Sequence, residues 1–270
     1  MLIAAFVFLF ASWGSAGVMA QSSGEVSATQ RSEPNSITLS YTHDRFDQIF
    51  DPWNTGYVQL SRQTPYGSAL ARVNMGSRFE TTGYQPQIDF YPSLVDGMYG
   101  YLNAGYSNSS IFPQYRFGAE LFKSLPRAFE VSAGFRHLRF SESNVTILTG
   151  SLTKYIGNYL FTARPYVTPN DLGVSSSLTL IARKYFSTAD NYITMRGGFG
   201  FSPEERTFQL NVNEEIFLLQ SSYIGIDGYK EVWSNVLLFA SVDGTRQEIW
   251  FDPGEFFFRI TLNTGLILRF

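Results

Sequence analysis

Apolar and polar residues alternate along most of this chain with a period of two. In the first such run, Ile37, Leu39 and Tyr41 are separated by Thr38 and Ser40. Further runs of this kind lie at residues 69–75, 115–121, 129–136, 193–199 and 256–266. Successive side chains of a β-strand point to opposite faces, so each run predicts a strand with one apolar and one polar face. No stretch shows the period of about 3.6 residues that is typical of an amphipathic helix.

The length of the runs separates two all-β architectures that both alternate. The runs extend over about ten residues, whereas strands of soluble β-sandwiches cluster near five or six. A strand that crosses a bilayer needs about nine to eleven residues. We therefore predict a single closed antiparallel transmembrane β-barrel rather than a soluble β-sandwich. Counting the runs gives about fourteen strands, with about twelve as the alternative.

The connections between the runs are of two kinds. Short turn signals lie at residues 64–67, 125–127, 157–158, 189–191 and 227–228. Longer polar connections are predicted at residues 43–55, 107–113, 168–173, 202–213 and 243–255. Bacterial barrels have short periplasmic turns and longer outer loops. A first strand that runs outward from Ile37 therefore places most short turns, and both ends of the barrel, in the periplasm.

Composition supports a membrane barrel and excludes several other classes. Aromatic residues make up 17% and charged residues 16% of the chain, while the mean hydropathy is -0.08. The charged share is well below the roughly 25% of ordinary soluble domains. The net charge of -3 argues against a nucleic-acid partner. Because the chain has no Cys, a disulfide framework, a thiolate metal site, a Cys nucleophile and a lipid-modified Cys are excluded.

The two ends of the chain indicate export to the cell surface. Residues 1–20 are predicted to be a signal peptide cleaved after Ala20, because their apolar run is short for a membrane anchor. Residues 21–35 are polar and are interpreted as a flexible periplasmic leader, which leaves residues 36–270 for the barrel. Leu266, Leu268 and Phe270 form an alternating last strand with a terminal aromatic, the pattern of a C-terminal outer-membrane assembly signal. The predicted location is the outer membrane of a Gram-negative bacterium.

The polar face of the strands is expected to line the barrel interior. On this register the charged lining residues are Arg72, Asp89, Arg116, Glu120, Glu130, Arg136, Arg164, Arg183, Arg196 and Arg259. We expect Glu120 and Glu130, on neighbouring strands, to pair with Arg116 and Arg136. In one interpretation such pairs stiffen and plug the barrel, since buried charges usually pair. In the other, the surplus of arginine favours passage of anionic or sugar-like solutes.

Candidate catalytic residues are few. His43 and Asp44 lie at the predicted outer end of the first strand, where some barrel proteases place a His–Asp pair. The other histidine, His137, is remote in sequence and on the outward face, so no metal site is predicted. The glycine-rich residues 197–201 lie within a strand and precede no helix, which excludes a phosphate loop. We expect no enzyme activity and no cofactor.

An acidic and aromatic segment at residues 44–53 follows the first strand. Its carboxylates and aromatic rings are chemically suited to a sugar or a Ca²⁺ ion. Loop composition alone does not define a site, so we interpret the segment as an ordinary outer loop.

Three stretches in the middle of the chain resemble a known family. They are YRFGAELFKSLPRAFEVSAGFRHLRF at 115–140, VTILTGSLTKYIGNYLFTARPY at 145–166 and SSLTLIARKYF at 176–186. These stretches resemble the YaiO family of outer-membrane β-barrels, and the resemblance extends over residues 36–270. It implies a barrel that, in some relatives, is attached to helical repeats and associated with surface-polysaccharide export. Residues 21–35 are too few for such a repeat, and the family implies no established catalytic residues.

Three functions are left open by the sequence. The first is a non-enzymatic barrel for export or passage of a surface polysaccharide or another solute. The second is a structural or interaction barrel that binds a partner through its outer loops. The third is a rim hydrolase that uses His43. The expected partners are outer-membrane lipid, the outer-membrane assembly machinery and polysaccharide-export components.

Overall fold

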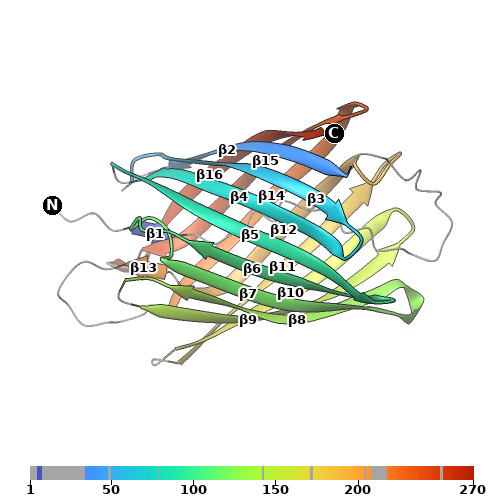
Figure 1. The fold of residues 1–270 in the computed structure, drawn as a ribbon. Helices are drawn as coiled ribbons and strands as arrows, with labels where there is room; N and C mark the ends of the chain where they lie inside the picture. The colour runs from blue at the N-terminus through green and yellow to red at the C-terminus, as the bar shows by residue number, and fades with distance from the viewer. Residues whose placement is uncertain are drawn as a thin grey trace.

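Fourteen antiparallel strands close into one barrel in the computed structural model (Figure 1). The structure describes residues 5–7, 34–47, 50–78, 80–141, 143–170, 173–203, 205–207, 218–249 and 252–270. The barrel strands are β2 (Asn35–Phe46), β3 (Trp53–Thr64), β4 (Gly67–Arg78), β5 (Thr81–Val95), β6 (Met98–Tyr106), β7 (Tyr115–Leu125), β8 (Phe129–Arg139), β9 (Asn144–Ile156), β10 (Tyr159–Asn170), β11 (Gly173–Tyr185), β12 (Tyr192–Pro203), β14 (Leu218–Trp233), β15 (Val236–Ile249) and β16 (Asp252–Arg269). The prediction of a closed barrel of about fourteen strands is confirmed, and the alternative of twelve is wrong.

A seam between the first and last barrel strands closes the sheet. β16 pairs with β2 along eleven registered positions from Arg259↔Phe46 to Arg269↔Ser36. At its end, Asn35 N donates to Phe270 O at 3.1 Å, and Phe270 N donates back to Asn35 O at 3.0 Å. Apart from the barrel, β1 (Ala5–Val7) pairs with β13 (Glu205–Thr207). The rest of the predicted signal peptide and residues 21–33 lie outside the described residues.

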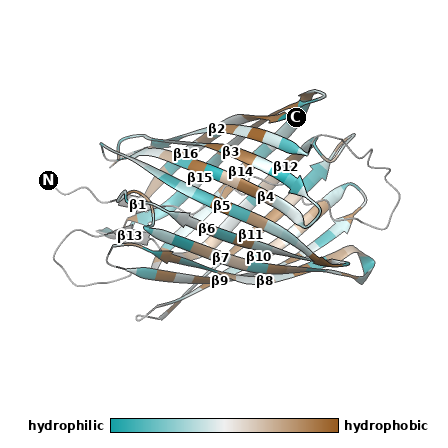
Figure 2. Cartoon of the chain, viewed as in Figure 1, coloured by the Kyte–Doolittle hydropathy of each residue, from teal (hydrophilic) through white to brown (hydrophobic). Residues whose placement is uncertain are grey.

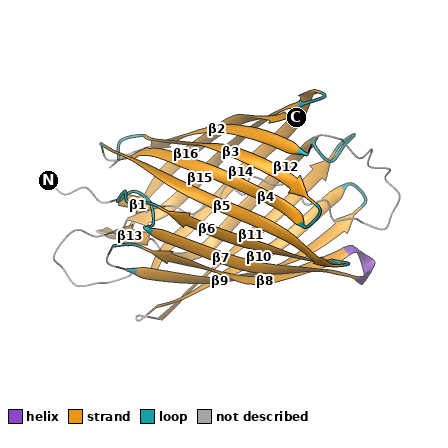
Figure 3. Cartoon of the chain, viewed as in Figure 1, coloured by secondary structure: helices purple, strands orange, loops and turns teal. Residues whose placement is uncertain are grey.

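The two ends of the barrel differ in their connections. The turns at 65–66, 96–97, 157–158 and 234–235, and the short helix η1 (Pro126–Ala128), lie at the end that carries Asn35 and Phe270 (Figure 3). The connection at 186–191 also lies at this end, while the opposite end carries the two longest connections, at 107–114 and between β12 and β14. We assign the first end to the periplasm, because bacterial barrels have short periplasmic turns. No helix among the described residues is long and apolar enough to cross a membrane.

One expected turn is strand instead, and two expected outer connections are shorter than predicted. Asp227 and Gly228 lie within β14, Asp243 lies in the middle of β15, and His43 lies before the end of β2. An Asp followed by Gly predicts a turn in water because Gly tolerates turn conformations. Inside a barrel, pairing on both sides keeps the backbone extended, and an Asp can face the polar interior. The strands are therefore longer, and the outer loops shorter, than the sequence suggested.

Between its two ends, the barrel has a largely polar inner face and a largely apolar outer face, because the two kinds of residue alternate along the strands. On β5, Asp89 is only 3% exposed while its neighbour Ile88 is 63% exposed. The same contrast recurs around the barrel, where apolar positions alternate with polar ones along the strands (Figure 2). Because the exposed set is apolar, this outer face is suited to the hydrocarbon core of a bilayer. Leu266 and Leu268 belong to that outer face of β16, and Phe270 follows directly after the strand.

Candidate functional site in the barrel interior

The ten charged residues expected to line the lumen all occupy inward-facing strand positions. The structure adds six more, which are Asp44, Arg78, Asp227, Glu231, Asp243 and Arg269. Asp227 and Asp243 were missed because the residues around them resembled turns. Asp44 and Arg269 continue the alternation of β2 and β16. Asp44 is two residues from the inward-facing Thr42, and Arg269 is six residues from the inward-facing Asn263, so an even spacing in the sequence already indicated that both face inward.

A polar network around Asp89 connects β5, β6 and β7. The carboxylate accepts hydrogen bonds from Gln87 Nε2 at 2.8 Å, Tyr101 Oη at 3.0 Å and Asn103 Nδ2 at 2.5 Å. Arg116 Nε in turn donates to Asn103 Oδ1 at 3.1 Å. The negative charge is thus held by several donors, as a carboxylate away from bulk water requires.

A second network joins β7 to β10 around Glu120. Glu120 Oε1 lies 2.7 Å from Arg164 Nη1, and Ser132 Oγ donates to the same oxygen at 2.5 Å. The side chains of Arg164 and Glu120 are 9% and 2% exposed. We expected the partner on the neighbouring strand, but this ion pair reaches three strands along the sheet. Inward side chains converge toward the axis of a closed barrel, so long side chains from strands that are not neighbours can meet.

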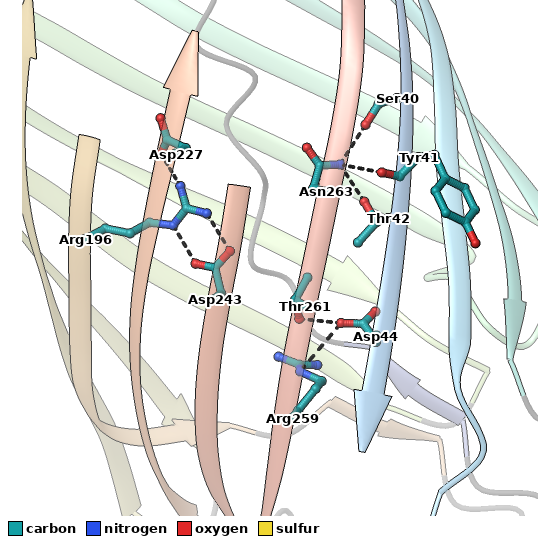
Figure 4. Close-up of polar contacts among 10 residues, drawn as sticks. All are labelled: Ser40, Tyr41, Thr42, Asp44, Arg196, Asp227, Asp243, Arg259, Thr261 and Asn263. Atoms are coloured by element: carbon teal, nitrogen blue, oxygen red, sulfur yellow. Dashed lines mark hydrogen bonds and ion pairs between the residues drawn. The ribbon is translucent and has the colours of Figure 1, made fainter. Parts of the chain in front are cut away.

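A third cluster consists of Arg196 on β12, Asp227 on β14 and Asp243 on β15 (Figure 4). Arg196 Nε and Nη2 donate to the two oxygens of Asp243 at 2.9 and 2.7 Å, and Nη1 donates to Asp227. This bidentate arrangement, with two parallel N–H···O bonds, is the preferred geometry between a guanidinium group and a carboxylate. The side chain of Arg196 keeps 29% of its surface exposed, against 9% for that of Arg164. This cluster is therefore more accessible to a solute in the lumen than the pair of Glu120 and Arg164.

Arg259 and Asp44 form a buried pair across the seam of β16 and β2 (Figure 4). Arg259 Nε lies 3.7 Å from Asp44 Oδ1, and Thr261 Oγ1 donates to that oxygen at 2.5 Å. Further along the seam, Asn263 Nδ2 donates to Ser40 Oγ at 2.8 Å and to Thr42 Oγ1 at 2.7 Å. Polar side chains therefore bridge the seam from inside the barrel.

The interior of the outer end is apolar. Phe46, Trp53, Ile249 and Phe257 form a buried cluster, which we call the mouth cluster, and Phe50 packs against it. Trp53 and Phe257 are each 1% exposed. The ring centroids of Phe46 and Trp53 are 4.6 Å apart in an edge-to-face arrangement. The mouth cluster covers the inner surface of four adjoining strands where the barrel opens to the outside.

The connection at residues 107–114 folds into the same end of the barrel. Ile111 is 1% exposed and lies against the inward-facing Gly76, where an added Cβ would be 3.2 Å from Ile111 Cδ1. Gln85 Nε2 donates to Pro113 O at 3.0 Å, and Ser107 Oγ donates to Tyr84 O at 2.7 Å. The connection is therefore fixed against the inner wall of β4 and β5, and it narrows the outer mouth.

The residues proposed for a rim hydrolase do not come together. His43 faces outward, and its Nδ1 lies 2.9 Å from Asn54 Oδ1. Asp44, the next residue of the same strand, faces inward toward Arg259. His137 is also outward, with Nδ1 2.9 Å from Thr146 Oγ1 on β9. Among the described residues no group of three His, Cys, Asp or Glu is arranged to hold a metal ion.

Taken together, the closed sheet, the apolar outer face and the charged interior define a transmembrane β-barrel. The family described as YaiO membrane beta barrel domain matches residues 34–205, which is more than half of the chain. The chain belongs to this family, and the protein is an outer-membrane barrel. The family match ends before β14, so the three strands that complete the barrel lie beyond it.

Two solved structures share this architecture at low sequence identity. One is the outer membrane protein Omp33 of Acinetobacter baumannii, with a TM-score of 0.51, 10% identity, and coverage of 89% of this chain and 100% of that chain. The other is a bacterial polysaccharide outer membrane secretin, with a TM-score of 0.53, 7% identity, and coverage of 88% and 99%. At such identities the likeness concerns the fold alone. A comparison with curated proteins finds no match.

Proposed function

We propose that the barrel is a non-enzymatic pathway for an anionic solute, with an acidic surface polysaccharide as the favoured cargo. The proposal is carried by the surplus of arginine on the inner wall. Inward positions in regular register hold nine arginines (72, 78, 116, 136, 164, 183, 196, 259 and 269) and seven acids (44, 89, 120, 130, 227, 231 and 243). One of the arginines, Arg269, pairs with Asp190 in the connection after β11. A ring of guanidinium groups lowers the barrier for anions and raises it for cations.

The chemistry of the inner wall also suits a sugar polymer. Amide and hydroxyl side chains such as Gln59, Gln87 and Thr149 stand between the charged groups and offer both donors and acceptors. Arg72 lies over the ring of Tyr57 at 4.3 Å, so the wall combines aromatic and cationic surfaces. One of the solved barrels described above is a polysaccharide outer membrane secretin, which makes a polysaccharide the first cargo to test.

A second candidate function is supported by the outer mouth. The mouth cluster and the connection at 107–114 fill part of the outer opening with buried apolar side chains. A barrel that is closed there would act as a structural or interaction protein, with its outer surface as the binding face. Conductance distinguishes the two functions directly, since a closed barrel passes no ions.

The test is electrical. The purified barrel is inserted into planar bilayers, and the reversal potential is measured across a KCl gradient. We expect discrete conductance steps with preference for chloride. Replacing both Asp227→Asn and Asp243→Asn removes the partners of Arg196 and should increase that preference, whereas the outward-facing Arg246→Gln should leave it unchanged. Absence of conductance, or a preference for potassium, would overturn the anion pathway.

The polymer is tested separately in the host. Deleting the gene should lower the amount of surface-bound acidic polysaccharide while leaving polymer synthesis in the cytoplasm intact. Complementation with the parent chain should restore the polymer at the surface. Unchanged surface polymer together with an anion-selective conductance would retain the pathway and discard the polysaccharide as its cargo.

A further inference from the structure

Lysine and arginine are segregated in this barrel. The chain has four lysines, Lys123, Lys154, Lys184 and Lys230. Each faces outward, because the preceding residues Phe122, Thr153, Arg183 and Tyr229 occupy inward positions. All the inward cations of the described strands are arginines. Each lysine also lies near the periplasmic end of a strand that runs toward the periplasm, on β7, β9, β11 and β14 respectively.

The pairing register shows that these positions lie at one level. Lys123 pairs with Val131, which pairs with Leu152, and Lys154 lies two residues further toward the periplasm. The same step of two residues per two strands leads from Lys154 to Lys184 and from Lys184 to Lys230. Strands of a barrel are tilted by about 35–45°, so a horizontal path must advance along the strands as it crosses them. The oblique strands are visible in Figure 1.

Closure of the path confirms the level. Continuing from Lys230 with the same step gives Leu268 on β16, then Arg62 on β3, Pro92 on β5, and again Lys123. A path that stays at one height in the membrane must return to its starting residue after one turn around the barrel. A uniform advance of two residues for every two strands meets this condition, and no other uniform advance does. Five of its seven positions are therefore cations, which we call the basic ring: Arg62, Lys123, Lys154, Lys184 and Lys230.

We infer that the basic ring binds the phosphate groups of anionic phospholipids in the periplasmic leaflet. Its members lie on the lipid-facing side, and none of its seven positions is acidic. A lysine near the bilayer surface can bury its aliphatic stem in the hydrocarbon and place its ammonium among the headgroups. An anionic headgroup is attracted there more strongly than a zwitterionic one.

Aromatic side chains beside two of the lysines indicate how deep in the bilayer the basic ring lies. Lys154 Nζ lies 4.1 Å from the ring centroid of Phe129, and Lys184 Nζ lies 5.5 Å from that of Tyr159. Tyr159 is 40% exposed on the same outer face. Aromatic side chains collect where the hydrocarbon of a bilayer meets the headgroups. The ammonium groups of Lys154 and Lys184 therefore lie at the level of this aromatic belt, where that of Lys154 also donates to the carbonyl oxygen of Arg127.

Native mass spectrometry of the whole barrel tests this inference. The protein is released from micelles doped with phosphatidylglycerol or phosphatidylcholine, and the retained lipids are counted. We expect about a fivefold preference for phosphatidylglycerol at each lysine. Replacing the four lysines by Gln should lower the preference to the contribution of Arg62 alone, and replacing them by Arg should keep it in full. The matched control replaces the outward arginines of the opposite end, Arg45, Arg139 and Arg246, by Gln and should keep the preference.

Folding of each variant is checked by the heat-dependent change in gel mobility of the intact barrel, so loss of structure is recognised. Equal retention of the two lipids by the parent would overturn the inference. So would an unchanged preference in the folded Lys→Gln variant. A preference lost only in the control variant would move the lipid site to the outer leaflet and would equally refute the basic ring.

Discussion

The buried pair of Glu120 and Arg164 offers a quantitative test of the interior. Replacing Arg164→Met keeps the length of the side chain and removes its charge. Glu120 is then left in a site where its side chain is 2% exposed, with Ser132 as its remaining donor to Oε1. Breaking a buried pair on one side costs about 3–5 kcal/mol, since an uncompensated charge remains. Arg164 itself is 9% exposed, so solvent screens little of this cost.

The double variant Arg164→Met with Glu120→Gln removes both charges and should recover about half of the lost stability. Unfolding is followed by guanidinium titration in lipid vesicles with tryptophan fluorescence, and the coupling of the pair comes from the double-mutant cycle. We expect a coupling of about 2 kcal/mol. As a control, the outward-facing Arg246→Met should cost less than about 1 kcal/mol. The reasoning is refuted if Arg164→Met matches this control or if the double variant is no more stable than the single one.

Three shorter predictions concern other parts of the barrel. Gly134→Ala should destabilise by about 1–3 kcal/mol, because its Cβ would lie 2.4 Å from Ala119 O, whereas Gly244→Ala meets nothing within 4 Å and should be neutral in the same titration. Phe270→Ser should reduce the folded barrel in outer-membrane fractions, and Phe258→Ser on the same face of β16 should not; equal effects would contradict a terminal assembly signal. His43→Ala should leave any hydrolysis of peptide and lipid substrates unchanged, and a selective loss of such activity would revive the rim hydrolase.

Alternation was enough to predict the sidedness of most strands, and together with the length of the runs it predicted the architecture. Period-two patterning is imposed directly by the bilayer outside and the polar lumen inside, so it can be read from one strand at a time. For this reason Arg72, Glu130 and Arg183 were assigned to the interior without any knowledge of pairing. The same logic identified Phe270 as the end of a lipid-facing strand face.

Contacts between side chains could not be predicted in the same way. The partner of Glu120 is on β10 because side chains of distant strands meet inside a curved wall, and no local pattern encodes curvature. Asp227 was interpreted as part of a short turn and Asp243 as the start of an outer connection. In the structure Gly225 provides the space for Asp243, since a Cβ at Gly225 would lie 1.9 Å from Asp243 Oδ1. A glycine in one strand thus serves a carboxylate in the next.

The seam between β2 and β16 has a consequence for the order of events during biogenesis. Its partners, such as Asn35 and Phe270, are separated by almost the whole barrel sequence. Contacts of such long range form slowly, because the chain must first lose the entropy of a very large loop. Until β16 has been delivered, β2 presents an unpaired edge that invites pairing with other chains. Between secretion and closure, the protein is therefore at its most vulnerable to aggregation and most dependent on chaperones.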